Sequence, residues 1–180
     1  MKQRFLLAAG LAVAMFTAPA FAADGSAGYY RIEAGNSNLE IDGSDGDEFG
    51  YSVRGGYFFN AYVGIEGFYT DLGRDSDEFA SVEAHAFGVG AVVKKNFGSE
   101  PHKGFFVGGR AGISRIDLNV DIDGFGIVDD GDNQPYYGIG AGYDFNEKMG
   151  VSINIDRFKS DLFDTDFQFT TTTAAFEYRF

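Results

Sequence analysis

One short segment of the sequence carries the three side-chain types of a hydrolytic site. Ser81, Glu83 and His85 would supply a nucleophile, an orienting acid and a general base. They are spaced two residues apart, and on one strand this spacing holds successive side chains about 7 Å from each other. A working catalytic hydrogen bond needs about 2.6–3.2 Å. We therefore interpret these residues as polar groups at the rim of a sheet, and we predict that the protein is not an enzyme.

A second segment has aspartates at spacings that partly match a calcium-binding loop. These aspartates are Asp121, Asp123, Asp129 and Asp132. Phe125 occupies a ligand position, Asp stands where the EF-hand has its last Glu, and no helical pattern flanks the segment. Because runs of like charge are usually solvated surface, we predict no metal site here and no cofactor.

The composition excludes several classes of protein. The 180 residues include no Cys, which rules out disulfide scaffolds, cysteine-ligated metals and cysteine catalysis. Aromatic residues make up 17% of the chain, which is too many for a disordered protein. A net charge of −13 argues against a nucleic-acid partner, because phosphate binding depends on Lys and Arg. No run of about 20 apolar residues exists, so helical membrane spans are not expected.

The first 22 residues have the pattern of a secretory signal peptide. Lys2 and Arg4 form a basic start, residues 5–16 are apolar, and residues 19–22 end in the small-x-small pattern that precedes cleavage. An uncleaved anchor is disfavoured because twelve apolar residues are too few to span a bilayer. We expect a mature domain over residues 23–180, exported across the inner membrane. Loss of the two basic residues leaves this mature chain with a net charge of −15.

Apolar and polar residues alternate with a period of two in eight segments of the mature chain. The segments are 30–34, 49–57, 63–69, 87–94, 105–114, 137–144, 149–156 and 172–180. Most are close to the 9–11 residues that a tilted strand needs to cross a bilayer. Long polar links at 36–48, 70–83, 115–134 and 156–167 alternate with short links at 59–61, 95–103 and 146–148. This pattern predicts an all-β fold: an eight-stranded, antiparallel, up-and-down transmembrane β-barrel with its long loops outside the cell.

The charges within the segments indicate which face points inward. One face carries glycines and single charges at mid-strand, namely Arg31, Glu33, Arg54, Glu66, Arg110 and Glu177. The opposite face has no charge across the middle of any segment. A soluble sandwich would bury the apolar face instead. Because an Arg or Lys on the lipid face costs about 2–4 kcal/mol at the midplane, we predict that these six residues form a self-neutralising polar network inside the barrel.

The excess negative charge lies in the four long links. They contain 20 acidic and 4 basic residues, so they carry essentially all of the net charge. Such an acidic outer rim could bind divalent ions that bridge to anionic sugars of the outer leaflet, or it could be a solvated surface.

The end of the chain has a further motif, Thr173-x-Ala175-x-x-Tyr178-x-Phe180. It resembles the C-terminal signal by which the barrel-assembly machinery recognises bacterial outer-membrane proteins, with Ala175 in place of the usual Gly. The mature chain resembles the OmpA-like and OmpX/Ail-like eight-stranded barrels, and residues 135–145 and 151–158 are most like the OmpA transmembrane domain. This resemblance implies a monomer in the bacterial outer membrane, surrounded by lipid and lipopolysaccharide. The peptidoglycan-binding domain of OmpA has no counterpart here, so cell-wall attachment is not expected.

Two functions remain open at this point. An eight-stranded barrel is just wide enough for its own side chains, which favours a structural or adhesin-like protein that meets an unidentified extracellular ligand through its acidic loops. A narrow channel or a small-solute-binding barrel is the alternative, because inward-facing glycines could leave a gap beside the charges. These glycines are Gly88, Gly90, Gly138, Gly140 and Gly142. The gap would close if bulky neighbours such as Phe68 and Phe106 lay across them.

Overall fold

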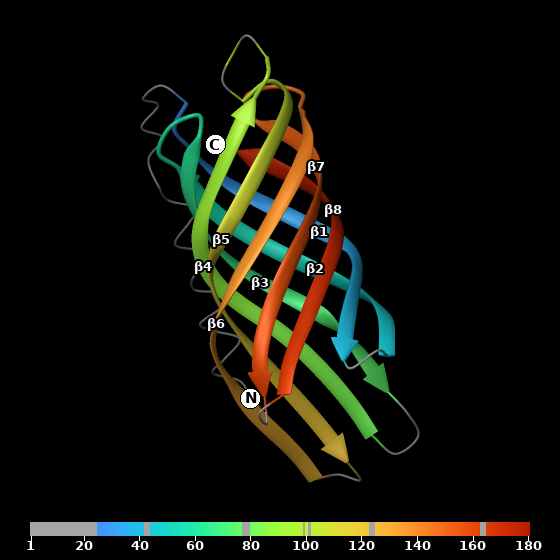
Figure 1. The fold of residues 1–180 in the computed structure, drawn as a ribbon. Helices are drawn as coiled ribbons and strands as arrows, with labels where there is room; N and C mark the ends of the chain where they lie inside the picture. The colour runs from blue at the N-terminus through green and yellow to red at the C-terminus, as the bar shows by residue number, and fades with distance from the viewer. Residues whose placement is uncertain are drawn as a thin grey trace.

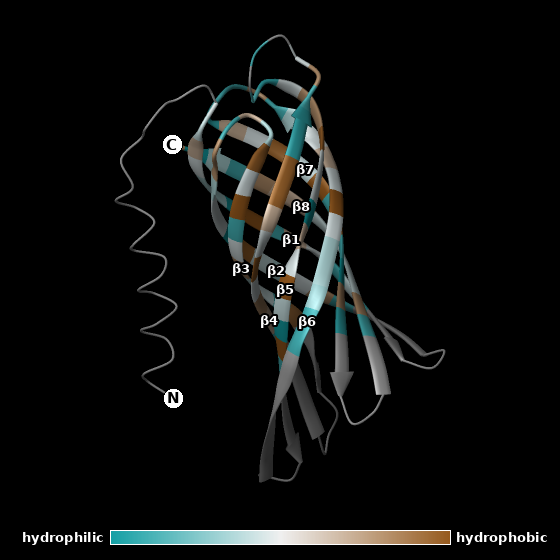
Figure 2. Cartoon of the chain, turned by 60° about the vertical axis from the view of Figure 1, so that its left-hand side comes forward, coloured by the Kyte–Doolittle hydropathy of each residue, from teal (hydrophilic) through white to brown (hydrophobic). Residues whose placement is uncertain are grey.

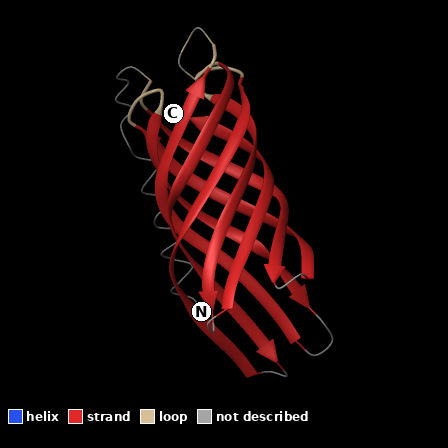
Figure 3. Cartoon of the chain, viewed as in Figure 1, coloured by secondary structure: helices blue, strands red, loops and turns tan. Residues whose placement is uncertain are grey.

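The computed structural model describes residues 25–41, 44–76, 80–98, 100, 102–122, 125–162 and 165–180. These residues form eight strands: β1 (Ala27–Ile41), β2 (Ser44–Phe58), β3 (Val63–Ser76), β4 (Ala80–Asn96), β5 (Gly104–Ile122), β6 (Phe125–Asp144), β7 (Met149–Leu162) and β8 (Thr165–Arg179). Each strand pairs antiparallel with its neighbours in the sequence, and β8 pairs with β1 to close a barrel (Figures 1 and 3). The predicted eight-stranded antiparallel barrel is therefore confirmed.

The barrel is closed by the pairing of its first and last strands. β1 and β8 are paired from Tyr29 opposite Arg179 to Glu40 opposite Gln168. One residue further, Phe180 exchanges two backbone hydrogen bonds with Gly28. The Phe180 ring lies on Gly28, where a Cβ would come within 2.7 Å of it, and it stacks on Tyr30 with centroids 5.0 Å apart. The last aromatic residue thus seals the β1–β8 seam.

The strands are longer than the sequence predicted. They contain 14 to 20 residues, and most of each long link continues as a paired hairpin. The expectation of long loops was therefore wrong, because the described residues of these links lie mostly in strands. The links are 36–48, 70–83, 115–134 and 156–167. Antiparallel pairing continues to satisfy backbone groups outside a membrane. Both faces meet water there, so the alternation that marks a strand is lost.

Between the middle of the barrel and the tips of the long hairpins, the wall separates into two sheets. The pairing of β2 with β3 ends at Tyr51 opposite Asp71, and that of β6 with β7 ends at Tyr136 opposite Phe158. All other described neighbours stay paired nearly to the tips of their hairpins. The long-hairpin end therefore consists of one sheet of β7, β8, β1 and β2 and another of β3, β4, β5 and β6, which diverge in Figure 2.

The short-turn end has two matched turns and one longer turn. Asn60 accepts backbone hydrogen bonds from residues 62 and 63, and Asn146 accepts the same pair from residues 148 and 149. This is the local geometry that favours Asn in turns. The third turn, between β4 and β5, carries His102 with a φ of 51°.

The outer surface of the barrel is apolar at mid-height. Ile139 and Ile153 are 69% and 64% exposed, whereas Ile116 points inward and is 1% exposed. Hydrophobic and hydrophilic residues alternate along the strands in Figure 2. Among the described residues, no helix is long and apolar enough to cross a membrane. The outer wall thus carries many exposed large apolar side chains, as expected for a barrel that is surrounded by lipid.

Candidate functional site

The structure places all six residues of the predicted polar network in the barrel interior. Arg31, Glu33, Arg54, Glu66, Arg110 and Glu177 are all buried. They come from β1, β2, β3, β5 and β8, and each follows the inward phase of its strand. Their neighbours in the chain, such as Ile32 and Ile65, are exposed on the outer wall. The period-two pattern of the sequence is therefore what aims these charges into the lumen.

The first ion cluster is centred on Arg110. Its Nη1 and Nη2 donate to Glu33 Oε1 and Oε2 at 2.7 and 3.0 Å, and its Nε donates to Asp156 Oδ1 at 2.6 Å. Arg54 Nη1 donates to Glu66 Oε1 at 2.9 Å, and Nη2 reaches Asp156 Oδ2 at 3.4 Å. Two cations here face three carboxylates, so this cluster alone has an excess negative charge.

The second ion cluster lies nearer the short turns. Lys94 Nζ is 2.9 Å from Asp144 Oδ2 and 3.2 Å from Glu177 Oε1. Arg179 Nη2 donates to Asp144 Oδ1 at 2.9 Å, and Nη1 donates to Glu177. Arg179 also donates to the backbone carbonyls of residues 146 and 147, which ties this cluster to the β6–β7 turn.

Arg31 connects the two clusters. Its Nε donates to Glu177 Oε2 at 3.0 Å, while Nη1 lies 3.8 Å from Glu33 and 3.9 Å from Glu66. With Arg31, the described interior holds five cations and five carboxylates in one network. The network is neutral, which is the condition for holding so many charges out of water.

The predicted six-residue network omitted four members: Lys94, Asp144, Asp156 and Arg179. Lys94, Asp144 and Arg179 lie near strand ends, outside the mid-strand positions from which the network was predicted. Asp156 was placed at the start of a long outer link, but β7 continues to Leu162 and keeps Asp156 fully buried. The alternation along β7 could have identified Asp156, because it continues the inward-facing series of Ser152 and Asn154.

Apolar side chains close the network at both ends. Towards the long hairpins, eight buried residues form one cluster: Phe68, Leu72, Ala84, Ala86, Ile116, Tyr136, Phe158 and Phe169. Towards the short turns, Tyr29, Phe58 and Val92 form another. The layers are joined by polar contacts, since the hydroxyls of Tyr29 and Tyr136 both donate to Glu66, at 3.0 and 3.1 Å.

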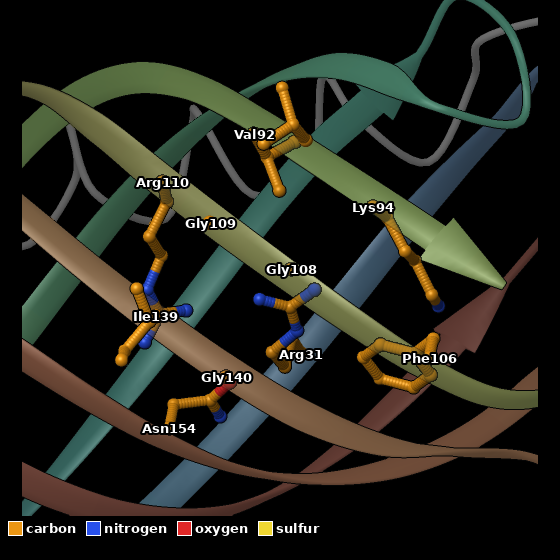
Figure 4. Close-up of a pocket in the computed structure, with 11 residues that line it drawn as sticks. Arg31, Val92, Lys94, Phe106, Gly108, Gly109, Arg110, Ile139, Gly140 and Asn154 are labelled. Atoms are coloured by element: carbon orange, nitrogen blue, oxygen red, sulfur yellow. The ribbon is translucent and has the colours of Figure 1, made fainter.

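Neighbouring side chains fill the space above the inward-facing glycines. An added Cβ would meet Phe68 at Gly88, Tyr136 at Gly90, Asp156 at Gly138, Asn154 at Gly140 and Phe106 at Gly142, each within 3 Å. At Gly108 no side chain lies that close. A cavity of about 20 Å³ remains there, bordered by Arg31, Lys94, Phe106 and Arg110 (Figure 4). This volume holds about one water molecule.

Of the candidate catalytic and metal-binding residues, only His85 has a described side chain, and it lies outside this interior. His85 Nδ1 is 3.0 Å from the Tyr69 hydroxyl and 3.7 Å from Asp71 Oδ2, so the described partners of its ring come from β3. The side chains of Ser81 and Glu83 are outside the described residues, as are those of Asp121, Asp129 and Asp132 and the whole of Asp123. The backbone places residues 121, 129 and 132 on β5 and β6, where a loop was expected.

The four residues of the C-terminal motif occupy both faces of β8. Thr173 and Ala175 are buried in the lumen, and the Thr173 hydroxyl donates to Glu33 at 3.3 Å. Tyr178 is exposed on the outer wall, and Phe180 packs on Gly28. In the closed barrel, the motif thus contributes to the lumen and to the β1–β8 seam.

The network makes a prediction about Glu66, whose carboxylate accepts from Arg54, Tyr29 and Tyr136. Glu66→Ala removes one member of a buried ion cluster and leaves Arg54 undercompensated, so the free energy of unfolding should fall by about 3–5 kcal/mol. Urea titration of the barrel in lipid vesicles measures this change. The matched control is Glu100→Ala, because Glu100 pairs with Lys103 at 2.9 Å on an exposed turn. That variant should unfold close to wild type, and equal urea midpoints for the two variants would contradict the role of the network.

Comparison with protein families gives one match that covers almost the whole chain. The model for the outer membrane protein beta-barrel domain matches residues 8–180. No protein of curated function matches the sequence significantly.

Several solved structures share the fold. Neisserial surface protein A (NspA) is 14% identical, with a TM-score of 0.65 over 87% of this chain and 100% of that one. Ail of Yersinia pestis is 18% identical, with a TM-score of 0.62 over 88% and 100%. The N-terminal β-barrel domain of Pseudomonas aeruginosa OprF is 16% identical, with a TM-score of 0.55 over 83% and 97%. These identities show the shared fold alone. The family match is what assigns the chain: it belongs to the outer membrane protein beta-barrel family and resides in the bacterial outer membrane.

Proposed function

We propose that the protein is a sealed barrel with a structural and surface-interaction role, and that it has no enzymatic activity. The observation that carries this proposal is the filled lumen. Ten paired charges extend from its middle towards the short turns, and buried apolar side chains pack beside them and towards the long hairpins. The cavity beside Gly108 is too small for any solute larger than water. Such a barrel anchors the hairpins and contributes to envelope integrity, and the hairpins meet the environment.

The shape of the extracellular end supports an interaction role. The two four-stranded sheets separate on the long-hairpin side of Tyr51 and Tyr136, so strand edges there have no described partner within the barrel. Unpaired edges and protruding hairpins offer backbone donors and acceptors to another molecule. We infer that these hairpins are the contact surface, and that the barrel is a monomer inserted by the barrel-assembly machinery.

Charge limits the chemistry of the extracellular partner. Apart from the buried Asp156, the four hairpin segments carry 19 acidic and 4 basic residues. A structure of Ail is a complex with the heparin analogue sucrose octasulfate, a polyanion. The hairpins of the present protein are negatively charged, whereas a surface that attracts a polyanion is positively charged. We propose that the partner is cationic, or is an anionic lipid sugar that is bridged by divalent ions.

A narrow channel is the competing function, and conductance decides between the two. In planar bilayers at neutral pH, the wild-type barrel should give no current steps above noise, because the neutral network and the aromatic layers fill the lumen. Arg110→Ala, which opens the centre of the network, is the informative variant. Current steps in wild type that change in Arg110→Ala would instead establish a channel.

The surface role is tested separately with intact cells. Changing Asp121, Asp129, Asp130 and Asp132 to Asn removes four charges from the β5–β6 hairpin and changes none of the ten residues of the luminal network. Adhesion of cells to an immobilised cationic protein should fall severalfold in this variant and weaken with salt in wild type. The control is Glu100→Gln with Glu147→Gln at the periplasmic end, and heat-modifiable gel mobility verifies a folded barrel. Unchanged adhesion, or stronger binding of wild type to sucrose octasulfate than to the cationic protein, would contradict the proposal.

A further inference from the structure

One titratable side chain outside the network occupies an unusual place. His102 lies in the periplasmic turn between β4 and β5, yet it is only 4% exposed. The other two periplasmic turns are closed by Asn60 and Asn146 through backbone hydrogen bonds, and they carry no buried titratable group among their described residues. The backbone at His102 has a φ of 51°, a conformation that a non-glycine residue adopts at some cost. The turn is therefore built so that this imidazole points into the barrel mouth.

His102 joins two distant parts of the chain. Its ring packs against Phe58 at the end of β2, with centroids 5.4 Å apart, and Phe58 is fully buried. Its Nε2 lies 2.8 Å from the carbonyl oxygen of Gly25, just before β1. Gly25 in turn sits against Ala61, where a Cβ would come within 3.0 Å. The imidazole thus covers Phe58 and holds Gly25 at the periplasmic mouth.

These contacts define the protonation state of the closed form. A carbonyl oxygen only accepts, so Nε2 must carry the proton and donate to Gly25. Nδ1 is enclosed, and no described group hydrogen-bonds to it. A second proton on Nδ1 would therefore be buried without a described acceptor.

The charged groups around His102 disfavour that second proton. Burial lowers the pKa of the His102 imidazole. The Gly25 hydrogen bond opposes this shift, Arg179 on β8 and Lys94 on β4 add to it, and Asp144 on β6 partly offsets it. Asp144 is already bonded to both Lys94 and Arg179.

We propose that His102 is a proton-released latch on the periplasmic mouth: the neutral ring holds Gly25 and covers Phe58, and protonation frees both. The closed form binds fewer protons than the open form, so closure is fully favoured above the ordinary imidazole pKa of about 6.5. Closure weakens as pH falls below that value, by up to about tenfold in population per pH unit. This device is independent of the proposed surface role, because it lies at the opposite end of the barrel.

The test uses the whole barrel in lipid nanodiscs and its two histidines, with the His85 signal assigned through His85→Gln. Nuclear magnetic resonance should find His102 as the neutral Nε2–H form at pH 7.5, titrating below the ordinary range. Amide exchange at Ser26 and residues 102–104, relative to Tyr62 and Lys148 in the two Asn turns, should rise about tenfold between pH 6.5 and 5. The Asn turns are the internal control, because no titrating group closes them.

His102→Gln separates the latch from general acid loosening. The Gln amide keeps an N–H donor for Gly25 but does not titrate, so the relative exchange at Ser26 should become independent of pH. Acid-dependent exchange in His102→Gln equal to wild type would overturn the proposal. So would a His102 imidazole in wild type that titrates at or above its ordinary pKa, a result that needs no variant to fold.

Discussion

The structure depends on one constraint: hydrocarbon around the barrel excludes charge from the outer wall, so every charge within the membrane must be inside. The wall is a single layer of strands, and its side chains alternate between the two environments. Ten charges consequently share a narrow lumen. Arg110 illustrates how they are tolerated, since it meets both Glu33 and Asp156 through directed hydrogen bonds. Desolvation of each ion is offset by at least one close partner of opposite sign.

The same constraint explains why side chains fill the lumen. The interior is too narrow for large side chains on every strand, so glycines on one strand admit the side chains of the next. Phe68 crosses Gly88, and Phe106 crosses Gly142. Each strand is thereby packed by its neighbours' side chains, and the pattern that first suggested a gap turns out to be the means of filling it. Beyond the membrane the constraint ends, and there the wall separates into two sheets of acidic hairpins.

Much of this architecture could be predicted from the sequence, because a membrane imposes a strict period of two. Strand number, topology and the inward phase of Arg31 or Glu66 follow from that period alone. It fails where both faces meet water, which is why the strand extensions past Asn36 and Arg115 were missed. Asp156 was assigned to a link at the same boundary, although it continues the inward phase of Ser152 and Asn154.

Pairing partners and turn conformations lay further beyond sequence reasoning. Arg31 donates a hydrogen bond to Glu177, which is 146 residues away in the sequence. This contact depends on the register between the first and last strands of the closed barrel. His102 is a polar residue in a short polar turn, and its inward direction follows from a backbone conformation that no local pattern indicates. The contact of His102 with Gly25 and Phe58 at the periplasmic mouth therefore could not be predicted from the sequence.

The most direct test of the account asks which isoleucines touch hydrocarbon. The barrel, labelled at its Ile methyl groups, would be placed in nanodiscs with a lipid that carries a spin label in the middle of its acyl chain. Ile139 and Ile153 should broaden strongly and Ile116 should stay sharp, because the first two are exposed on the outer wall and the third is buried in the lumen. Sharp Ile139 and Ile153 signals, or a folded molecule that stays in water without lipid or detergent, would contradict the placement of charge on which everything else rests.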